Sequence, residues 1–97
     1  MQNFRTYNMS MAFYEKCQGL KLNGPMQNQF ERALLSSPTN LSEGSAKYSK
    51  KERKKFYHIA LGSLREVQTI LTLAKQEELL KEANSLGGSL YKLCKNS

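Results

Sequence analysis

The sequence lacks the features that identify most membrane, secreted and metal-binding proteins. It has two cysteines, Cys17 and Cys94, with no C-x-x-C pair, and a single histidine, so it carries no metal site of known spacing. No apolar run approaches the roughly 20 residues that a membrane-spanning helix needs. The N-terminal segment also lacks the continuous apolar stretch of a secretory signal. We therefore expect a soluble, cytoplasmic protein without a cofactor. Its two thiols are expected to be buried and unpaired, the alternative being a disulfide between them.

Strand signals are missing as well. Apolar and polar residues do not alternate over any long stretch, and the one Asn-Gly pair, Asn23-Gly24, precedes Pro25 instead of joining two apolar runs. Apolar residues recur instead at helical spacing, and 97 residues suit one small domain. We predict an all-α, antiparallel up-down-up-down four-helix bundle, with helices over residues 4–20, 25–46, 50–75 and 77–95.

The first two expected helices differ in how clearly they are bounded. Pro25 opens the second helix, where its missing N–H is no loss. Pro38 lies inside the second pattern, so we expect one kinked helix there, the alternative being a new helix capped by Ser37. The first helix has a predicted buried face at three- and four-residue steps. This face comprises Phe4, Tyr7, Met11, Tyr14 and Cys17.

The third expected helix has the clearest start, because Ser49 to Glu52 has the S-x-x-E form of a capping box. Tyr57 and Leu61 add a second apolar stripe, so the helix needs more than one neighbour. Its main apolar face comprises Phe56, Ile59, Ala60, Ser63, Leu64, Val67, Ile70, Leu71 and Ala74. In the fourth helix, Gly87-Gly88 is where a bend or split is expected, since each glycine costs about 1 kcal/mol against alanine.

Basic residues outnumber acidic ones by 15 to 8, and the excess is local. The segment from Lys47 to Lys55 reads KYSKKERKK and holds +5 of the chain's +7. A concentrated patch of this kind attracts phosphate backbones. Lysines near a helix N-terminus oppose the helix dipole, which favours a functional interpretation over the alternative of a merely solvated face.

The third helix extends this patch as a stripe. Lys51, Lys54, His58 and Arg65 fall along one side, and Gly62 leaves the middle of the stripe bare, so that a phosphate backbone can lie close. These residue types favour contacts to backbone and shape over base reading. The predicted nucleic-acid site comprises Lys47, Lys50, Lys51, Arg53, Lys54, Lys55, His58 and Arg65.

Two tyrosines and one histidine near the patch have alternative interpretations. Tyr48 and Tyr57 are suited to stacking on bases, but helix packing is the simpler role and the one we favour. His58 lacks a carboxylate to orient it, because Glu52 and Glu66 sit off its face. We therefore predict no enzyme activity.

Two parts of the chain resemble the signature of a bacterial protein family. Gln29 to Ala33, Ser36 to Pro38 and Asn40 to Gly44 read QFERA, SSP and NLSEG, similar to Q-L-x-R-A…S-I-P-x-N-[IL]-[AS]-E-G. Phe56 to Glu66 reads FYHIALGSLRE, similar to F-x-x-I-A-x-G-S-x-x-E. The chain thus resembles the four-helix bundle proteins encoded within intervening sequences of 23S ribosomal RNA genes. That family includes the accessory proteins of diversity-generating retroelements, whose G-S-L-R-E-x-Q string resembles Gly62 to Gln68.

The resemblance covers about residues 13–74 and carries expectations of its own. It implies a four-helix bundle that assembles into a ring, commonly a homopentamer, and it implies no enzyme activity. It also implies a basic surface, which in the retroelement proteins serves a reverse transcriptase and RNA. The family positions carried over to this chain are Arg32, Asn40, Glu43, Gly44, Gly62, Ser63 and Glu66.

These positions also have physical interpretations. Small residues at Gly62 and Ser63 would let a neighbouring helix approach closely, and Asn40 and Glu43 are expected to be buried polar groups with Arg32 as partner. The overall expectation is a basic, oligomeric accessory protein that binds RNA or DNA, with no membrane association. The alternative is an oligomeric scaffold whose partner is a protein.

Overall fold

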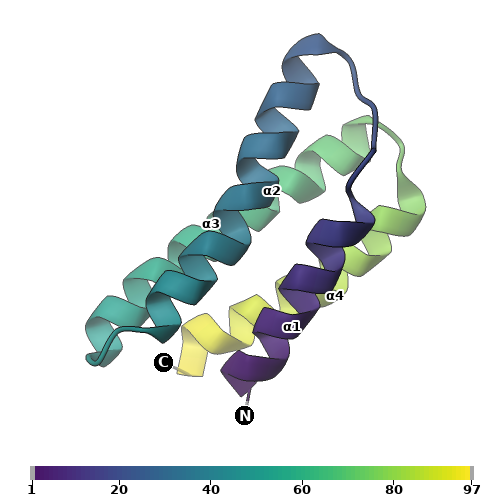
Figure 1. Ribbon diagram of the computed structural model, residues 1–97. Helices are drawn as coiled ribbons and strands as arrows, with labels where there is room; N and C mark the ends of the chain where they lie inside the picture. The colour runs from purple at the N-terminus through teal and green to yellow at the C-terminus, as the bar shows by residue number, and fades with distance from the viewer. Residues whose placement is uncertain (1, 97) are drawn as a thin grey trace.

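All four expected helices are present in the computed structural model, which describes residues 2–96 (Figure 1). They are α1 (Gln2–Lys16), α2 (Gly24–Ser45), α3 (Lys50–Leu73) and α4 (Glu77–Asn96), and no strand forms within that range. The bundle measures 40 × 21 × 19 Å. The predicted all-α four-helix fold is confirmed.

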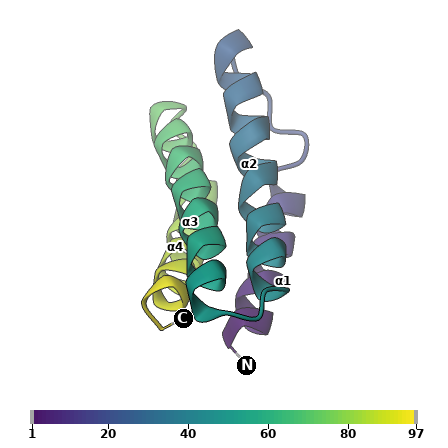
Figure 2. The same cartoon turned by 90° about the vertical axis from the view of Figure 1, so that its left-hand side faces the viewer.

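The helices are arranged in two layers of two. Figure 2 shows α3 beside α4 on one side of the molecule and α1 with α2 on the other. Each helix packs against two others, since α1 and α3 both contact α2 and α4. The contact between α2 and α3 is the most extensive, whereas α1 is packed more loosely. This arrangement fits the expected up-down-up-down order, in which consecutive helices are neighbours.

The first helix ends at Lys16, earlier than the predicted residue 20. Gly19 has a φ of 86°, in the left-handed region that glycine adopts without strain. The connection that follows is held by Gln27, whose Oε1 accepts from the Leu22 N–H at 2.6 Å while its Nε2 donates to Glu31 at 2.7 Å. The local turn chemistry therefore outweighed the helical periodicity.

The third helix likewise ends two residues before its predicted boundary, at Leu73. Lys75 has a φ of 58°, which is unusual for a residue with a side chain. The Lys75 N–H donates to the Thr72 carbonyl at 3.1 Å and the Gln76 N–H to the Leu71 carbonyl at 2.9 Å. This is the Schellman pattern, which supplies donors to the last carbonyls of a helix.

Pro38 does not divide α2, which runs continuously from Gly24 to Ser45. The alternative of a second helix start at this proline is therefore wrong. Thr39 Oγ1 donates to the Leu35 carbonyl at 3.0 Å, and Asn40 Nδ2 donates to the Ser36 carbonyl at 2.9 Å. These side-chain bonds reinforce the backbone around a residue that has no N–H of its own.

Helix α4 is also continuous through Gly87-Gly88, so the helix does not split at this pair. Gly87 is buried against α3, where an added Cβ would lie 3.0 Å from Gln68 Nε2 and 3.1 Å from Arg65 Nη1. Gly88 faces open space. Close packing at Gly87 thus offsets the low helix propensity of the pair.

The buried face of α1 differs from the predicted one. Thr6 and Ser10 are buried, whereas Phe4 and Met11 are 65 % and 40 % exposed. Thr6 Oγ1 lies 2.6 Å from Ser89 Oγ of α4. Small hydroxyl residues satisfy each other at this contact. Of the predicted face, Cys17 is buried and Tyr7 and Tyr14 pack against the core, so apolar periodicity located part of the buried face and missed Thr6 and Ser10.

Helix α3 buries most of its predicted face, with one shift. Tyr57 is 2 % exposed, and its hydroxyl lies 3.2 Å from Ser45 Oγ, whereas Ile59 is 42 % exposed. A buried tyrosine normally needs such a polar partner. The apolar core comprises Phe13, Cys17, Phe30, Ala33, Leu34, Leu41, Tyr57, Ala60, Leu64, Val67, Ile70, Leu71, Ala83, Leu86, Leu90, Leu93 and Cys94.

Candidate nucleic-acid interface

A short turn joins α2 to α3. The basic segment, residues 47–55, begins in this turn and continues into the first turns of α3, and we call it the basic tip. The N–H groups of Ala46 and Lys47 donate to carbonyls in the last turn of α2, at 3.2 and 3.1 Å. Ser49 Oγ accepts from the Glu52 N–H at 3.1 Å. The hydroxyl half of the predicted capping box is confirmed, although the described hydrogen bonds include no second bond from the Ser49 N–H to the Glu52 carboxylate. The turn is therefore tied to both helices.

Arg53 holds the turn from inside the basic tip. Its Nη1 donates to the Lys47 carbonyl at 3.1 Å and to the Tyr48 carbonyl at 2.5 Å, and the residue is half-buried. The sequence groups Arg53 with the lysines that are predicted to bind phosphate. In the structure this guanidinium positions the turn, which leaves the lysines to supply the free charge.

Four lysines of the basic tip project into solvent without a carboxylate partner. The ion pairs recorded for residues 2–96 are Lys16–Glu82, Lys47–Glu43 and Lys81–Glu78, so only one of them reaches the tip. Lys47 and Lys55 also lie over the Phe56 ring, 5.3 and 6.0 Å from its centroid. The unpaired and exposed lysines are Lys50, Lys51, Lys54 and Lys55.

The predicted stripe along α3 lies on the surface over its whole length. Lys51, Lys54, His58 and Arg65 are all exposed. A Cβ placed on Gly62 would have no atom of the chain within 4 Å, so the middle of the stripe is bare as expected. Arg65 differs from the others because its Nη1 donates to Gln68 Oε1 at 2.9 Å, towards α4.

The fold adds basic residues that the sequence analysis missed. In an up-down-up-down bundle, the start of α1 and the end of α4 lie at the same end as the α2–α3 turn, and both chain ends lie there in Figure 1. This places exposed Arg5, Lys92 and Lys95 at the end of the bundle that carries the basic tip. The order of the helices in the bundle, combined with the sequence positions of these basic residues, could have predicted their place.

The two tyrosines of this region have opposite environments. Tyr57 is buried in the core, as its predicted packing role requires. Tyr48 is 100 % exposed, so the predicted packing role is wrong for this residue. The turn is too short to fold back over the bundle, and Tyr48 stands beside the unpaired lysines.

Three of the family positions, Arg32, Ser63 and Glu66, line a polar groove between α2 and α3. A cavity of about 220 Å³ is lined by Gln29, Arg32, Ala33, Ser36, Ser63 and Glu66. Ser36 Oγ lies 2.7 Å from Ser63 Oγ, and Asn40 Nδ2 donates to Ser36 Oγ at 3.1 Å. The expected bond between Asn40 and Arg32 is therefore wrong, since Ser36 is the partner of the amide.

Three other expectations for these positions are corrected or refined. Glu43 is exposed and pairs with Lys47 at 3.4 Å, so it is not a buried partner of Arg32. Gly44 is buried, and an added Cβ would lie 2.9 Å from two atoms of the Tyr57 ring. Gly62 meets no neighbouring helix within the chain. The need for a small side chain within the fold is thus shown at Gly44 and not at Gly62.

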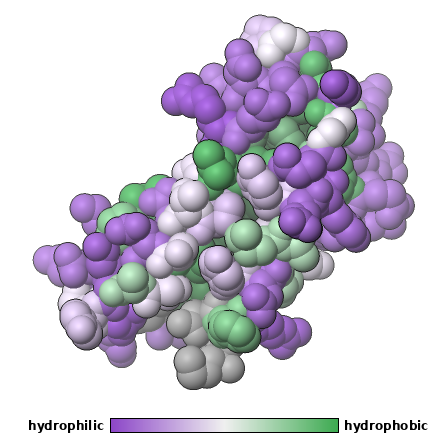
Figure 3. Space-filling model, in the orientation of Figure 1, coloured by the Kyte–Doolittle hydropathy of each residue, from purple (hydrophilic) through white to green (hydrophobic). Residues whose placement is uncertain are grey.

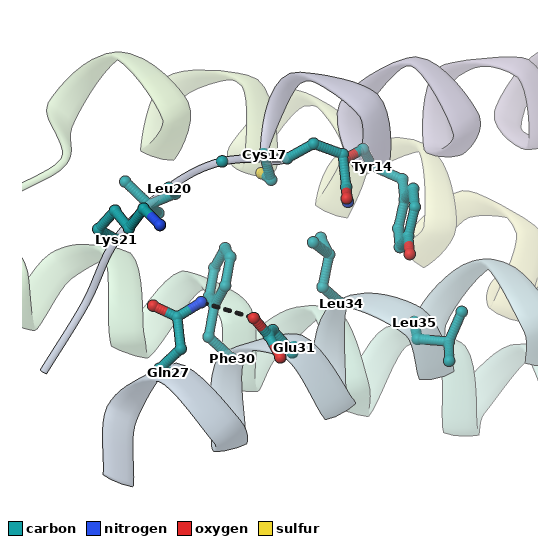
Figure 4. A pocket seen from close by; sticks show the side chains of 11 residues that line it. Tyr14, Cys17, Leu20, Lys21, Gln27, Phe30, Glu31, Leu34 and Leu35 are labelled. Atoms are coloured by element: carbon teal, nitrogen blue, oxygen red, sulfur yellow. Dashed lines mark hydrogen bonds between the residues drawn. The ribbon is translucent and has the colours of Figure 1, made fainter. Parts of the chain in front are cut away.

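A larger cavity lies at the opposite end of α2, away from the basic tip. It measures about 620 Å³ and is enclosed by the end of α1, the α1–α2 connection and the start of α2 (Figure 4). Cys17, Phe30 and Leu34 form its apolar floor, while Gln27 and Glu31 lie on its rim. Figure 3 shows paler and apolar residues continuing over the middle of the same face, below a strongly hydrophilic end.

The two cysteines are free and buried, as predicted. Burial raises the pKa of the Cys17 thiol from 9.0 to about 11, and the nearby Glu82 carboxylate adds to the rise. Burial also raises the pKa of Cys94, while Lys54 and Arg65 act to lower it. The charges that act on the two thiols therefore differ, since Cys17 senses Glu82 of α4 and Cys94 senses Lys54 and Arg65 of α3.

Residues 2–96 contain no candidate metal site and no candidate membrane-spanning helix. No group of three or more His, Cys, Asp or Glu side chains is placed to hold a metal ion. None of the helices in this range is both long and apolar enough to cross a membrane.

Comparison with known proteins gives one informative result. The family model described as 23S rRNA-intervening sequence protein matches residues 2–96. The match extends over all four helices, beyond the residues 13–74 that carry the sequence resemblance. The chain has no match among curated proteins or among solved structures.

Proposed function

Because the chain belongs to the 23S rRNA-intervening sequence protein family, we propose that it is a non-enzymatic, cytoplasmic protein that binds the phosphate backbone of RNA or DNA through the basic tip. The observation that carries this proposal is the set of four exposed lysines without carboxylate partners, Lys50, Lys51, Lys54 and Lys55. The family name alone refers to a genomic location and does not specify a ligand.

The electrostatics of the basic tip favour an anionic partner. Four cations at the first turns of α3 repel one another and oppose the helix dipole, whose N-terminus attracts negative charge. A phosphate placed there gains from both the lysines and the free N–H groups of the helix start. In the chain itself, Glu52 is the acidic residue of the first turn. A polyanion therefore relieves a charge excess that the fold leaves in place.

We further propose that the chain works as a homo-oligomer, with the pentameric ring implied by the resemblance, and that a reverse transcriptase is a candidate partner. Support comes from the groove between α2 and α3, where Arg32 and Glu66 are exposed and have no recorded ion pair. Leu73 and Ile59 are also 67 % and 42 % exposed on α3. A ring would present several basic tips at once, which raises avidity for a long polyanion.

The same groove supports a second candidate function. It offers polar groups away from the basic tip. A second cavity of about 310 Å³ shares Gln29 and Glu66 with the groove and adds the apolar Pro25, Met26 and Ile70. Such a surface suits an oligomeric scaffold that binds a protein. A pull-down that survives nuclease treatment and high salt would favour this scaffold. Light scattering of the purified protein would give the oligomeric state independently.

A salt series tests the nucleic-acid proposal. We expect the slope of log affinity against log salt on a duplex to be about −3.6 for each bound protomer, at roughly −0.9 per phosphate contact. Replacing Lys50, Lys51, Lys54 and Lys55 with glutamine should bring the slope near zero while leaving helicity intact. The matched control replaces Lys16, Lys21, Lys75 and Lys81, which removes the same charge from the other end and should keep the slope. Equal slopes for the two variants would contradict the proposal.

A further inference from the structure

Tyr48 is the most exposed large side chain for which the structure gives a value. Its side chain is 100 % exposed, compared with 54 % for Tyr91 and 2 % for Tyr57. A tyrosine ring normally contributes 150–250 Å² of buried surface. No residue of the described range 2–96 covers this surface, which lies near the start of the basic tip, in the turn before α3. The ring is therefore available to a partner.

The backbone that carries Tyr48 is fixed although its side chain is not. Arg53 Nη1 donates to the Tyr48 carbonyl at 2.5 Å and to the Lys47 carbonyl at 3.1 Å. On the other side, the Ser49 carbonyl accepts from the Arg53 N–H at 3.0 Å, and the Ser49 hydroxyl caps α3. A ring held at a fixed point loses less conformational freedom on binding than one on a mobile loop.

The charges around the ring suit a nucleotide more than another apolar group. Lys47 precedes Tyr48, and the unpaired Lys50 and Lys51 follow it within one turn of α3. An aromatic face beside cations is the combination that binds single-stranded nucleic acids, because a base stacks on the ring while phosphates meet the lysines. A duplex stacks its base faces internally, so it offers the ring no such surface.

We propose that Tyr48 is a stacking platform for an unpaired base, so that the basic tip prefers single-stranded or looped nucleic acid to a duplex. This inference rests on the proposed function and deepens it. The lysines supply affinity for any phosphate backbone, and Tyr48 supplies the preference for unpaired nucleotides. RNA and DNA share this chemistry, since every base has a flat face.

The test compares Tyr48→Ala with Tyr48→Phe and with the matched surface control Tyr91→Ala. Each protein is titrated at one salt concentration with a labelled single strand, as RNA and as DNA, and with a duplex. We expect Tyr48→Ala to weaken single-strand binding roughly 10- to 100-fold and duplex binding by less than about twofold. Tyr48→Phe and Tyr91→Ala should stay near the unchanged protein. The salt slope should not change, because no charge is removed.

A direct spectroscopic readout is available because the chain contains no tryptophan. In the variant Tyr48→Trp, the single indole should be quenched by a single strand and not by a duplex. Circular dichroism controls for folding, which a fully exposed position should not affect.

Three results would overturn the inference. These are equal losses for single strand and duplex, no loss in Tyr48→Ala, or a change in its oligomeric mass, which would place the ring between copies. In the first two cases, a lysine-dependent salt slope would show that the proposed function still holds. Absence of binding by the unchanged protein would instead refute both.

Discussion

The two ends of α2 differ in both packing and charge. At the basic tip, Gly44 packs directly on the Tyr57 ring and Arg53 ties the turn down, while four lysines remain unpaired. At the other end, a cavity of about 620 Å³ separates α2 from the end of α1. Ion pairs between Lys16 and Glu82 and between Lys81 and Glu78 lie near that end. One end is tightly packed and carries four unpaired lysines, and the other is loosely packed and carries two ion pairs.

We expect this difference to separate charge that serves stability from charge that is available to a polyanion. Exposed ion pairs contribute little to stability, and Glu77 and Glu78 begin α4 at the cavity end, so we expect a polyanion to find no net attraction there. Of the lysines in the basic tip, Lys47 alone has an ion pair among the described residues. The other lysines therefore keep the positive field of the tip. Its rigid turn also fixes where the charges point. The following predictions test whether the two ends are in fact so different, beginning with the largest expected effect.

Tight packing at the tip predicts that a single methyl group is poorly tolerated there. In Gly44→Ala the new Cβ would lie 2.9 Å from the Tyr57 ring and 3.0 Å from Phe56 Cβ. Overpacking costs roughly 1–3 kcal/mol, more than the roughly 1 kcal/mol that alanine gains in a helix. We therefore expect a net loss of unfolding free energy of up to about 2 kcal/mol in urea denaturation.

The matched change at the cavity end adds a larger group. Leu20 lines the cavity, so Leu20→Phe should alter stability by less than about 0.5 kcal/mol. If Leu20→Phe costs as much as Gly44→Ala, the two ends are packed alike and the comparison fails.

Arg53 and Lys16 test how each end uses a basic side chain. Arg53→Gln removes two charge-assisted bonds to backbone carbonyls and should cost about 1–2 kcal/mol of stability. Lys16→Gln breaks an exposed 2.7 Å ion pair with Glu82 and should cost between about 0 and 1 kcal/mol. Thermal unfolding of both variants measures the two stability costs. A larger cost for Lys16→Gln would mean that Arg53 does not hold the turn.

The thiols report the smallest expected effect, and with opposite signs. Lys54→Gln removes a cation that lowers the Cys94 pKa, so this pKa should rise and alkylation of Cys94 should slow. Glu82→Gln removes an anion that raises the Cys17 pKa, so this pKa should fall from about 11. Alkylation rates across alkaline pH, resolved by mass spectrometry, measure both. A response of both thiols to either change would show that the two ends are not electrostatically separate.

The four helices could be predicted from the sequence because their apolar periodicity and their start signals agree. Ser49 and Pro25 mark helix starts, and both are used as expected. The early end of α1 and the continuity of α4 could not be derived, because both depend on local geometry and tertiary contacts. Gly19 adopts a left-handed conformation, and Gly87 is stabilised by its packing on α3.

The sequence predicts the positive charge of the candidate site but not the role of each basic residue in it. A cluster of basic residues is visible in the sequence, but the different use of Arg53 and Lys50 depends on which carbonyls the turn presents. Burial likewise separates Tyr48 from Tyr57, although both flank the same cluster. The contribution of Lys92 required the bundle topology.

The most direct test of the central claim is a lysine footprint, in which acetylation of each lysine is measured by mass spectrometry with and without a single-stranded RNA. One experiment then reports both ends of the bundle in the same molecule. We expect Lys50, Lys51, Lys54 and Lys55 to be protected several-fold, while the control group Lys16, Lys21, Lys75 and Lys81 reacts as in the free protein. Protection of the control group, or equal protection of both groups, would contradict the account.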